Sequence, residues 1–298
     1  MTFARLEVDG VNRATSVRQF ASGKSVNCAR VLHTLGERVL TTGLVGGDAG
    51  MFMRSNLDAD GIAHDFVDTS PVETRLCLTL VDEAAGTATE LVEESRAIDP
   101  RSSDELLSKL ELLLAANDVK VLVLSGTLVP GSGDDFYAKC LRLANARSVQ
   151  TVLDARGEPL KLALSERPDV VKPNRAELAA TVGAPIDSET SLRDAIRSIV
   201  EFGARWVVVT DGPRDTVVSD GSKFWRVTPL KIDAVNPIGS GDSFAAGLAS
   251  ALRGGHEVPP ATVLATACAA ANALTVDAGH VRREDVERLR AQVRIEAI

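Results

Sequence analysis

Short, continuous apolar runs that alternate with helical patterns constrain the fold of this chain more than any other feature of its sequence. Runs that end in small or polar residues occur at 38–46, 121–126, 151–155, 169–173 and 206–212. Apolar residues at helical spacing occur at 51–61, 102–117, 134–146 and 188–203. Continuous apolar strands are typical of a parallel sheet that is covered by helices on both faces. The alternation therefore predicts a doubly wound, mainly parallel α/β sheet with right-handed crossovers.

Two regions depart from this alternation. Residues 3–21 and about 73–95 alternate between polar and apolar side chains, and the second region carries a turn signal near 84–86. Such alternation predicts a small antiparallel sheet that stands off the main body, as a lid over a site or as a dimer face. We expect residues 1–298 to form a single domain with this appendage. From Asp242 onward the pattern is almost wholly helical, with helices expected at 242–253, 260–276 and about 283–295.

The charge balance and the distribution of cysteines exclude several classes of protein. The 298 residues include 33 basic and 41 acidic side chains, and the net charge of -8 argues against general affinity for nucleic acid. No apolar run has the length of a membrane span, and the first residues resemble neither a signal nor a transit peptide. The four cysteines are scattered without metal-ligand spacing. A cytoplasmic protein with free thiols is expected.

The segment VNPIGSGDSFAAGLAS, residues 235–250, is the strongest candidate for chemistry. Gly239, Ser240 and Gly241 precede a predicted helix, so their backbone amides could bind an anion at its positive end. Asp242 could accept the proton of an attacking hydroxyl beside that anion. The alternative is a simple helix start, because aspartate and glycine are common there.

Two further segments carry candidate ligands for phosphate and metal. In ASGKS, residues 21–25, the spacing of glycines rules out a P-loop, but Lys24 and Asn27 could hold a sugar phosphate and sugar hydroxyls. A solvated lysine and a helix-start amide explain these two residues equally well. In VKPNRAEL, Asn174 and Glu177 lie one helical turn apart and could bind magnesium through water, or could form a capping box.

Three other features of the sequence are weaker indications of a functional site. Arg75 lies in the predicted lid and could reach a phosphate, although an exposed arginine is the simpler interpretation. The loop at 124–137 and the turn at 209–215 each follow an apolar run, where ligands bind in open parallel sheets. The histidines show no mutual spacing that suggests a triad or a metal site, and we expect them to be structural.

With these segments in order, the sequence resembles the ribokinase-like (PfkB) carbohydrate kinases. The resemblance covers nearly the whole chain and is closest to the phosphosugar branch, which contains 1-phosphofructokinase and tagatose-6-phosphate kinase. VNPIGSGDSFAAG matches the family's second signature, D/N-x-x-G-A-G-D-x-F. The resemblance implies that Gly239, Ser240 and Gly241 form an anion hole and that Asp242 is the catalytic base.

The resemblance also implies roles for residues in the other segments. ASGKSVNCARVLHTLG resembles the first signature and places Lys24 and Asn27 at the sugar phosphate, although Ala21, Ser22 and Ser25 stand where Pro, Gly and Gly are usual. It further implies that Arg75 holds the substrate phosphate from the lid and that Gly126 of LSGTLVPG lies near the sugar. The nucleotide contacts and magnesium ligands that it implies are Asn174, Thr210, Gly212 and Asn272 for the nucleotide, and Glu177 with Asn174, through water, for Mg²⁺.

The beginning of the chain differs from the family pattern. Members of the family open with a strand that ends in N-P-A-x-D, whereas MTFARLEVDG already looks like the first strand of the lid. The expectation is that one core strand is missing from the given N-terminus and that the start of translation is wrongly assigned.

The resemblance and the residues together predict an enzyme. The expected reaction is the ATP- and Mg²⁺-dependent phosphorylation of a phosphorylated ketose, with fructose 1-phosphate first and tagatose 6-phosphate next. The alternatives are a kinase for an unphosphorylated sugar, such as fructose or ribose, and a non-catalytic protein that binds sugar phosphate. The lid sheet could pair two subunits of a homodimer, since exposed sheet surface favours association.

Overall fold

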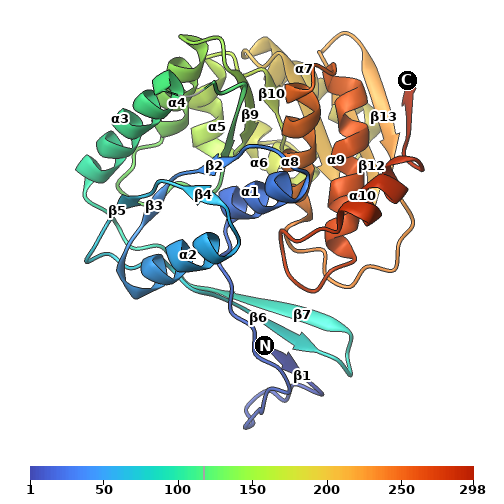
Figure 1. Cartoon of the computed structure of the whole chain (residues 1–298). Helices are drawn as coiled ribbons and strands as arrows, with labels where there is room; N and C mark the ends of the chain where they lie inside the picture. The colour runs from blue at the N-terminus through green and yellow to red at the C-terminus, as the bar shows by residue number, and fades with distance from the viewer. Residues whose placement is uncertain (117) are drawn as a thin grey trace.

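A seven-stranded sheet forms the centre of the molecule in the computed structural model, which describes residues 1–116 and 118–298 (Figure 1). The sheet has the strand order β14-β13-β12-β11-β10-β9-β8. Four neighbouring strands are parallel, namely β8 (Val121–Ser125), β9 (Gln150–Asp154), β10 (Val170–Val171) and β11 (Trp206–Asp211). They coincide with four of the predicted apolar runs. The central side chains of β9, β10 and β11 have almost no exposed surface, which confirms that both faces of the sheet are covered there, whereas most of β8, at the edge of the sheet, is only partly buried.

The other half of the sheet is antiparallel and was not predicted in detail. It consists of β12 (Arg214–Ser219), β13 (Phe224–Thr228) and β14 (Arg294–Ala297). The helix expected at 283–295 is too long, because α10 ends at Arg290 and the chain continues into β14. Pairing with β13 satisfies the backbone of 294–297, and this long-range gain outweighs the local helical spacing.

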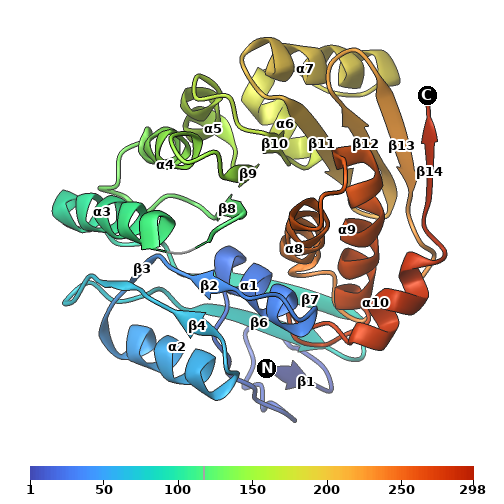
Figure 2. The same cartoon turned by 45° about the horizontal axis from the view of Figure 1, so that its top comes forward.

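Helices cover both faces of the sheet, as the predicted doubly wound fold requires (Figure 2). One face packs against α3 (Pro100–Ala116), α4 (Phe136–Asn145), α5 (Gly157–Leu164), α6 (Arg175–Val182) and α7 (Glu189–Glu201). The other packs against α1 (Lys24–Thr34), α8 (Ser240–Arg253), α9 (Val258–Ala273) and α10 (Arg283–Arg290). Asn117, the last residue of the helix predicted at 102–117, lies outside the described residues. Within the described part of the chain, no helix is both long and apolar enough to cross a membrane.

The run at 38–46 forms strands, but they lie outside the main sheet. It divides into β2 (Leu40–Thr41) and β3 (Leu44–Val45), which pair in parallel with β4 (Ala63–His64) and β5 (Val67–Asp68), respectively. Helix α2 (Gly47–Ala59) connects the two pairs and includes most of the helix expected at 51–61. These elements pack on a small core of their own, next to α1.

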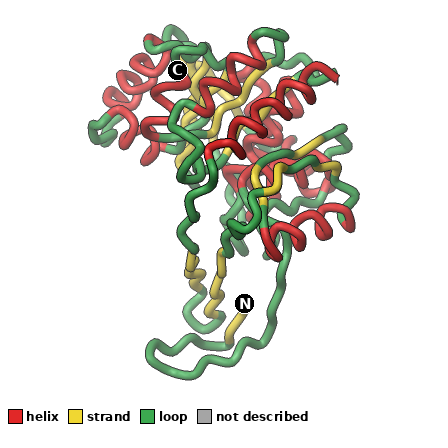
Figure 3. Tube along the Cα trace, turned by 90° about the vertical axis from the view of Figure 1, so that its left-hand side faces the viewer, coloured by secondary structure: helices red, strands yellow, loops and turns green. Residues whose placement is uncertain are grey.

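A separate three-stranded sheet stands away from the body, where a lid was expected (Figures 1 and 3). Strands β6 (Cys77–Asp82) and β7 (Thr87–Val92) form the expected antiparallel pair around a turn at 83–86. The third strand, β1 (Thr2–Phe3), is parallel to β6, which corrects the expectation of a purely antiparallel lid. We call β1, β6 and β7 the lid sheet below.

Most of the region 3–21 is not a strand, although its alternating pattern predicted one. The Asn12 side chain accepts a hydrogen bond from the Glu7 N–H at 2.9 Å and donates one to the Glu7 carbonyl at 2.8 Å. These bonds replace the strand partners that the backbone of Glu7 would need. Local side-chain bonds of this kind compete with sheet pairing and stabilise a loop instead.

Candidate active site

The loop before α8 presents backbone amides without a capping side chain. Gly239 precedes the helix with φ of 81°, and a Cβ atom there would lie 2.8 Å from the Gly279 nitrogen. No side chain caps α8, and within the described residues the N–H groups of Gly241 and Asp242 have no hydrogen-bond partner. These donors lie at the positive end of a 14-residue helix. The N–H group of Ser240 donates to the Pro237 carbonyl at 3.1 Å, which corrects the expectation that Ser240 is free to bind an anion. The arrangement supports an anion-binding site over a simple capped helix.

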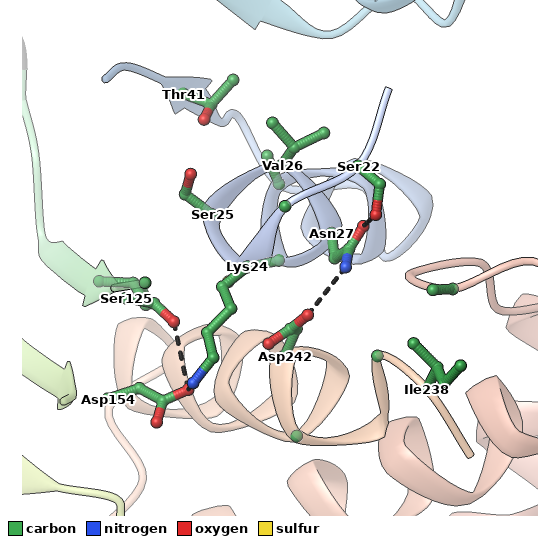
Figure 4. Close-up of a pocket in the computed structure, with 18 of the residues that line it drawn as sticks. Ser22, Lys24, Ser25, Val26, Asn27, Thr41, Ser125, Asp154, Ile238 and Asp242 are labelled. Atoms are coloured by element: carbon green, nitrogen blue, oxygen red, sulfur yellow. Dashed lines mark hydrogen bonds and ion pairs between the residues drawn. The ribbon is translucent and has the colours of Figure 1, made fainter. Parts of the chain in front are cut away.

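Asp242 lies at this end of α8 and is nearly buried, with 8 % of its surface exposed. Its Oδ2 accepts a hydrogen bond from Asn27 Nδ2 at 2.8 Å (Figure 4). The pKa of Asp242 is raised to about 6, chiefly by burial and in part by the nearby Asp154 carboxylate. The Asn27 hydrogen bond and the positive charges of two lysines lower this pKa. The result is a carboxylate that can take up a proton near neutral pH.

A buried ionic cluster lies beside Asp242, and the sequence reasoning named only part of it. Asp154, at the end of β9, accepts a hydrogen bond from Ser125 at 3.1 Å and forms ion pairs with Lys172 at 3.4 Å and Lys24 at 3.5 Å. Figure 4 shows Lys24 extended toward Asp154 beneath α1. The Asp154 and Lys172 side chains are only 2 % and 3 % exposed. The sequence signal for them was their position directly after buried apolar runs.

Asn174 and Glu177 form the capping box that was one of the two interpretations of VKPNRAEL. Asn174 Oδ1 accepts a hydrogen bond from the Glu177 N–H at 2.8 Å, and Glu177 Oε2 accepts one from the Asn174 N–H at 2.9 Å. The other carboxylate oxygen, Glu177 Oε1, lies 3.9 Å from Lys24 Nζ in the pocket. Because the capping box does not use this oxygen, it fits a magnesium ion that is held largely through water. The described residues contain no group of three or more acidic, histidine or cysteine side chains that would bind a metal directly.

The remaining predicted ligands come from widely separated elements. Thr210 lies in β11 and forms an isolated parallel bridge with Asn174, and Gly212 follows with φ of 57°. Gly126 follows β8 and accepts a hydrogen bond from the Tyr137 hydroxyl at 2.7 Å. Arg75 is exposed just before β6, with its guanidinium 3.4 Å from the Ser95 hydroxyl. All four residues line one continuous pocket together with Lys24, Asn27, Glu177 and the 239–242 loop.

Asn272 is the predicted ligand that the structure places elsewhere. Its exposed surface is 0 %, and it does not line the pocket. Its Nδ2 donates to the Ile238 carbonyl at 2.8 Å and to Ser240 Oγ at 3.2 Å, and its Oδ1 accepts from the Gly279 N–H at 2.7 Å. The expected contact with a nucleotide is therefore replaced by a supporting role, in which Asn272 holds the loop before α8.

Asn27 lines the pocket, and its expected contact with the substrate stays a prediction. It is buried, and its amide is engaged by Asp242 on one side and by the Ser22 hydroxyl, at 3.1 Å, on the other (Figure 4). The four histidines do not line the pocket, in agreement with the structural role expected for them. The four cysteines are free thiols.

The chain is similar to known proteins along nearly its whole length. The model of the family described as pfkB family carbohydrate kinase matches residues 1–284. A phosphofructokinase candidate from Staphylococcus aureus is 26% identical, with a TM-score of 0.80, over 100% of this chain and 94% of that one. Phosphofructokinase-2 from Escherichia coli, in complex with fructose-6-phosphate, is 24% identical, with a TM-score of 0.85, over 98% and 93%. A candidate 1-phosphofructokinase from Thermotoga maritima is 21% identical, with a TM-score of 0.81, over 100% and 95%.

Proposed function

The chain belongs to the pfkB family of carbohydrate kinases, and from this premise we propose that it transfers the γ-phosphoryl group of ATP to a hydroxyl of a phosphorylated ketose. The observation that carries the proposal is the meeting of three features at one point. These are the unpartnered amides that begin α8, the nearly buried Asp242 and the positive charges of Lys24 and Lys172. Together they suit a reaction in which a negative group is transferred and a proton must leave.

The roles of the residues follow from their positions. Asp242 takes the proton of the attacking sugar hydroxyl. The hydroxyl oxygen forms a bond to the γ-phosphorus of ATP, and the bond between that phosphorus and ADP breaks. The amides of Gly241 and Asp242 stabilise the charge on the phosphoryl oxygens. Lys172 Nζ would lie 3.9 Å from a Cβ at Gly241, so its charge is next to these amides. Asn174 and Glu177 would hold Mg²⁺ through water, and the ion would neutralise charge on the ATP phosphates.

Arg75 supports a substrate that carries its own phosphate. It lines the pocket from the lid side, and within the described residues its guanidinium has no carboxylate partner. An unpaired guanidinium that faces a pocket suits a phosphate, which it can bind in a bidentate manner. We propose fructose 1-phosphate as the substrate, with tagatose 6-phosphate next. Fructose 6-phosphate is a further candidate, because the Escherichia coli relative is seen in complex with it.

The test is ADP release from Mg-ATP over a panel of fructose 1-phosphate, fructose 6-phosphate, tagatose 6-phosphate, fructose and ribose. Turnover confined to one phosphorylated ketose would support the proposal, and Asp242→Asn serves as the control for contaminating kinases. Turnover of fructose or ribose alone would refute the role of Arg75 and favour a kinase for unphosphorylated sugars. Binding of sugar phosphate without any turnover would favour a non-catalytic protein.

We also propose that the lid sheet pairs two subunits. Four apolar side chains on or next to it are about half exposed, namely Leu76, Leu78, Leu91 and Val92. A second copy of the same sheet would cover this surface. Light scattering after size-exclusion chromatography is expected to give a dimer, and Leu78→Asp is expected to give a monomer. A wild-type protein that is monomeric at micromolar concentration would contradict this assembly.

A further inference from the structure

Two hydrogen bonds in series connect the solvent-exposed Ser22 to Asp242. The Ser22 hydroxyl donates to Asn27 Oδ1 at 3.1 Å, and Asn27 Nδ2 donates to Asp242 Oδ2 at 2.8 Å (Figure 4). Ser22 stands at a position where the sequence departs from the first signature, which has glycine. The departure therefore adds a hydroxyl that contacts the partner of the proposed base.

We propose that Ser22 is a positioning residue for Asp242, because its hydroxyl donates to the Asn27 amide oxygen and so helps to hold the NH₂ end of that amide against the carboxylate. An asparagine amide has one accepting end and one donating end. A hydroxyl that donates to the accepting end leaves the NH₂ group directed at Asp242. This inference rests on the proposed function, in which Asp242 is the base.

The packing around Asn27 fixes its Cα and Cβ atoms, so that only the terminal amide can still change its orientation. A Cβ atom at Gly279 would lie 2.7 Å from the Asn27 Cα and Cβ atoms, so the loop at Gly279 packs directly against the side chain. Asn272 holds that loop by accepting a hydrogen bond from the Gly279 N–H. Rotation of the terminal amide is a soft torsion with two favoured orientations. The ionised Asp242 at one end and the donating Ser22 hydroxyl at the other together hold the amide in one of them.

The selected orientation decides which form of the carboxyl group is favoured. A donating NH₂ group stabilises the ionised carboxylate, whereas an accepting oxygen would stabilise the protonated form. The hydrogen bond from Asn27 accordingly lowers the pKa of Asp242, against the rise that burial causes. Without the Ser22 hydroxyl, one of the two bonds that hold the amide is lost, so the amide turns more readily and accepts a hydrogen bond from the protonated carboxyl group. The pKa of Asp242 is then expected to rise.

Three other charged groups act on Asp242 and do not depend on Ser22. Asp154 at the end of β9 raises the pKa of Asp242, while Lys24 of α1 and Lys172 after β10 lower it. These three groups form an ionic cluster with one another. Loss of the Ser22 hydroxyl leaves that cluster in place. A shift in the pKa of Asp242 in the variant therefore reports on the amide.

The experiment compares Ser22→Ala with Ser25→Ala and Ser22→Thr in the full chain. Ser25 is a matched control, since it also replaces a signature glycine but points away from Asn27 (Figure 4). The pKa of Asp242 is measured by ¹³C NMR titration of its carboxyl carbon, assigned with Asp242→Asn. We expect Ser22→Ala to raise this pKa by about half a unit to one unit, in line with the loss of one hydrogen-bonded orientation. Ser25→Ala is expected to leave it unchanged, and Ser22→Thr to retain the wild-type value.

The dependence of kcat on pH gives a second measurement. The acid limb of the profile is expected to move upward in Ser22→Ala by the same amount as the pKa. An unchanged carboxyl pKa in Ser22→Ala, or an equal shift in Ser25→Ala, would overturn the inference. The NMR titration needs no turnover, so a wild-type chain that phosphorylates no sugar would refute the proposed function while the titration still decides the role of Ser22.

Discussion

The loop before α8 and the lid sheet both contribute to the same pocket, but they are built in opposite ways. Around the loop, Asp242 and Asn272 are nearly or fully buried, and Asn272 bonds to the backbone on both sides of it. In the lid sheet, every residue of β7 is exposed. Just before β6, the Arg75 side chain makes one hydrogen bond within the described residues, to Ser95 at 3.4 Å. The loop before α8 is held by contacts with several other segments, whereas the lid sheet is held mainly by the pairing of its own strands.

The difference separates chemistry from recognition. Proton transfer and phosphoryl stabilisation depend on atoms placed to within a fraction of an ångström, and close packing provides that precision. Holding a charged group and excluding water needs less precision and benefits from a part that can open. We infer that changes near α8 affect kcat, whereas changes in the lid sheet affect the apparent affinity for sugar phosphate.

The largest effect is expected at Asp242. Asp242→Asn keeps the shape of the side chain and an oxygen that can accept from Asn27, but removes the proton acceptor. We expect kcat to fall by about 100-fold to 10,000-fold, the usual range for general base catalysis, with little change in KM for ATP. Steady-state kinetics and circular dichroism of the variant check this. Activity within tenfold of the wild type would contradict the assigned role.

A smaller effect, of a different kind, is expected in the lid sheet at Arg75. Arg75→Ala removes a charged hydrogen-bond donor that faces the pocket, so we expect KM for the phosphosugar to rise by about 10-fold to 100-fold. The value of kcat, the KM for ATP and the melting temperature are expected to change little. Arg75→Lys should give an intermediate KM, because it keeps the charge without the bidentate geometry. A fall in kcat equal to that of Asp242→Asn would erase the distinction between the two regions.

The sequence predicted those parts of the fold that depend on local pattern. The parallel strands and the helices between them were found because buried runs and helical spacing are visible within a few residues. The end of α10 was not found, because Val286, Leu289 and Val293 continue the helical spacing across the boundary. Only pairing with β13, far away in the sequence, makes 294–297 a strand.

In the candidate site, too, the residues that are contiguous in the sequence could be predicted, and those that depend on distant partners could not. The 239–242 loop could be predicted because its residues are contiguous and their pattern is specific. The supporting role of Asn272 could not, since its partners Ile238 and Ser240 lie 34 and 32 residues away. The burial of Lys172 is likewise not visible in the sequence, because a lysine after a strand is usually solvated. Its burial results from the meeting of β9, β10 and α8, which the sequence does not show.

Gly279 tests how tightly the loop before α8 is packed. Both Gly279 and Gly86, in the lid turn, have positive φ, 72° and 64°, so alanine is strained at either position. A Cβ at Gly279 would meet Asn27 at 2.7 Å, whereas a Cβ at Gly86 would meet nothing within 4 Å. We expect Gly279→Ala to lose about 1–3 kcal/mol more of the free energy of unfolding than Gly86→Ala. It should also lower kcat through the displaced Asn27. Urea denaturation of the two variants measures the difference, and equal losses would show that the loop tolerates crowding.

The smallest expected effect concerns stability at different pH. Burial raises the pKa of Asp242 from 3.8 to about 6 in the folded protein, so folding favours the protonated form. The contribution of this carboxyl group to the free energy of unfolding is therefore greatest below pH 3.8 and is lost as the pH rises through about 6. Asp242→Asn has no such dependence. We expect its stability relative to the wild type to increase between pH 4 and pH 7 by about 1–3 kcal/mol.

The midpoints of urea unfolding at pH 4, 5, 6 and 7 measure this change, with Arg75→Ala as the control from the exposed region. Because Arg75 is exposed, its variant should follow the wild type at every pH. A difference between Asp242→Asn and the wild type that stays constant with pH would mean that the carboxylate is as well solvated as one on the surface. Burial of Asp242 would then not lower the stability of the protein near neutral pH. The loop before α8 and the lid sheet would differ only in how tightly their residues are packed.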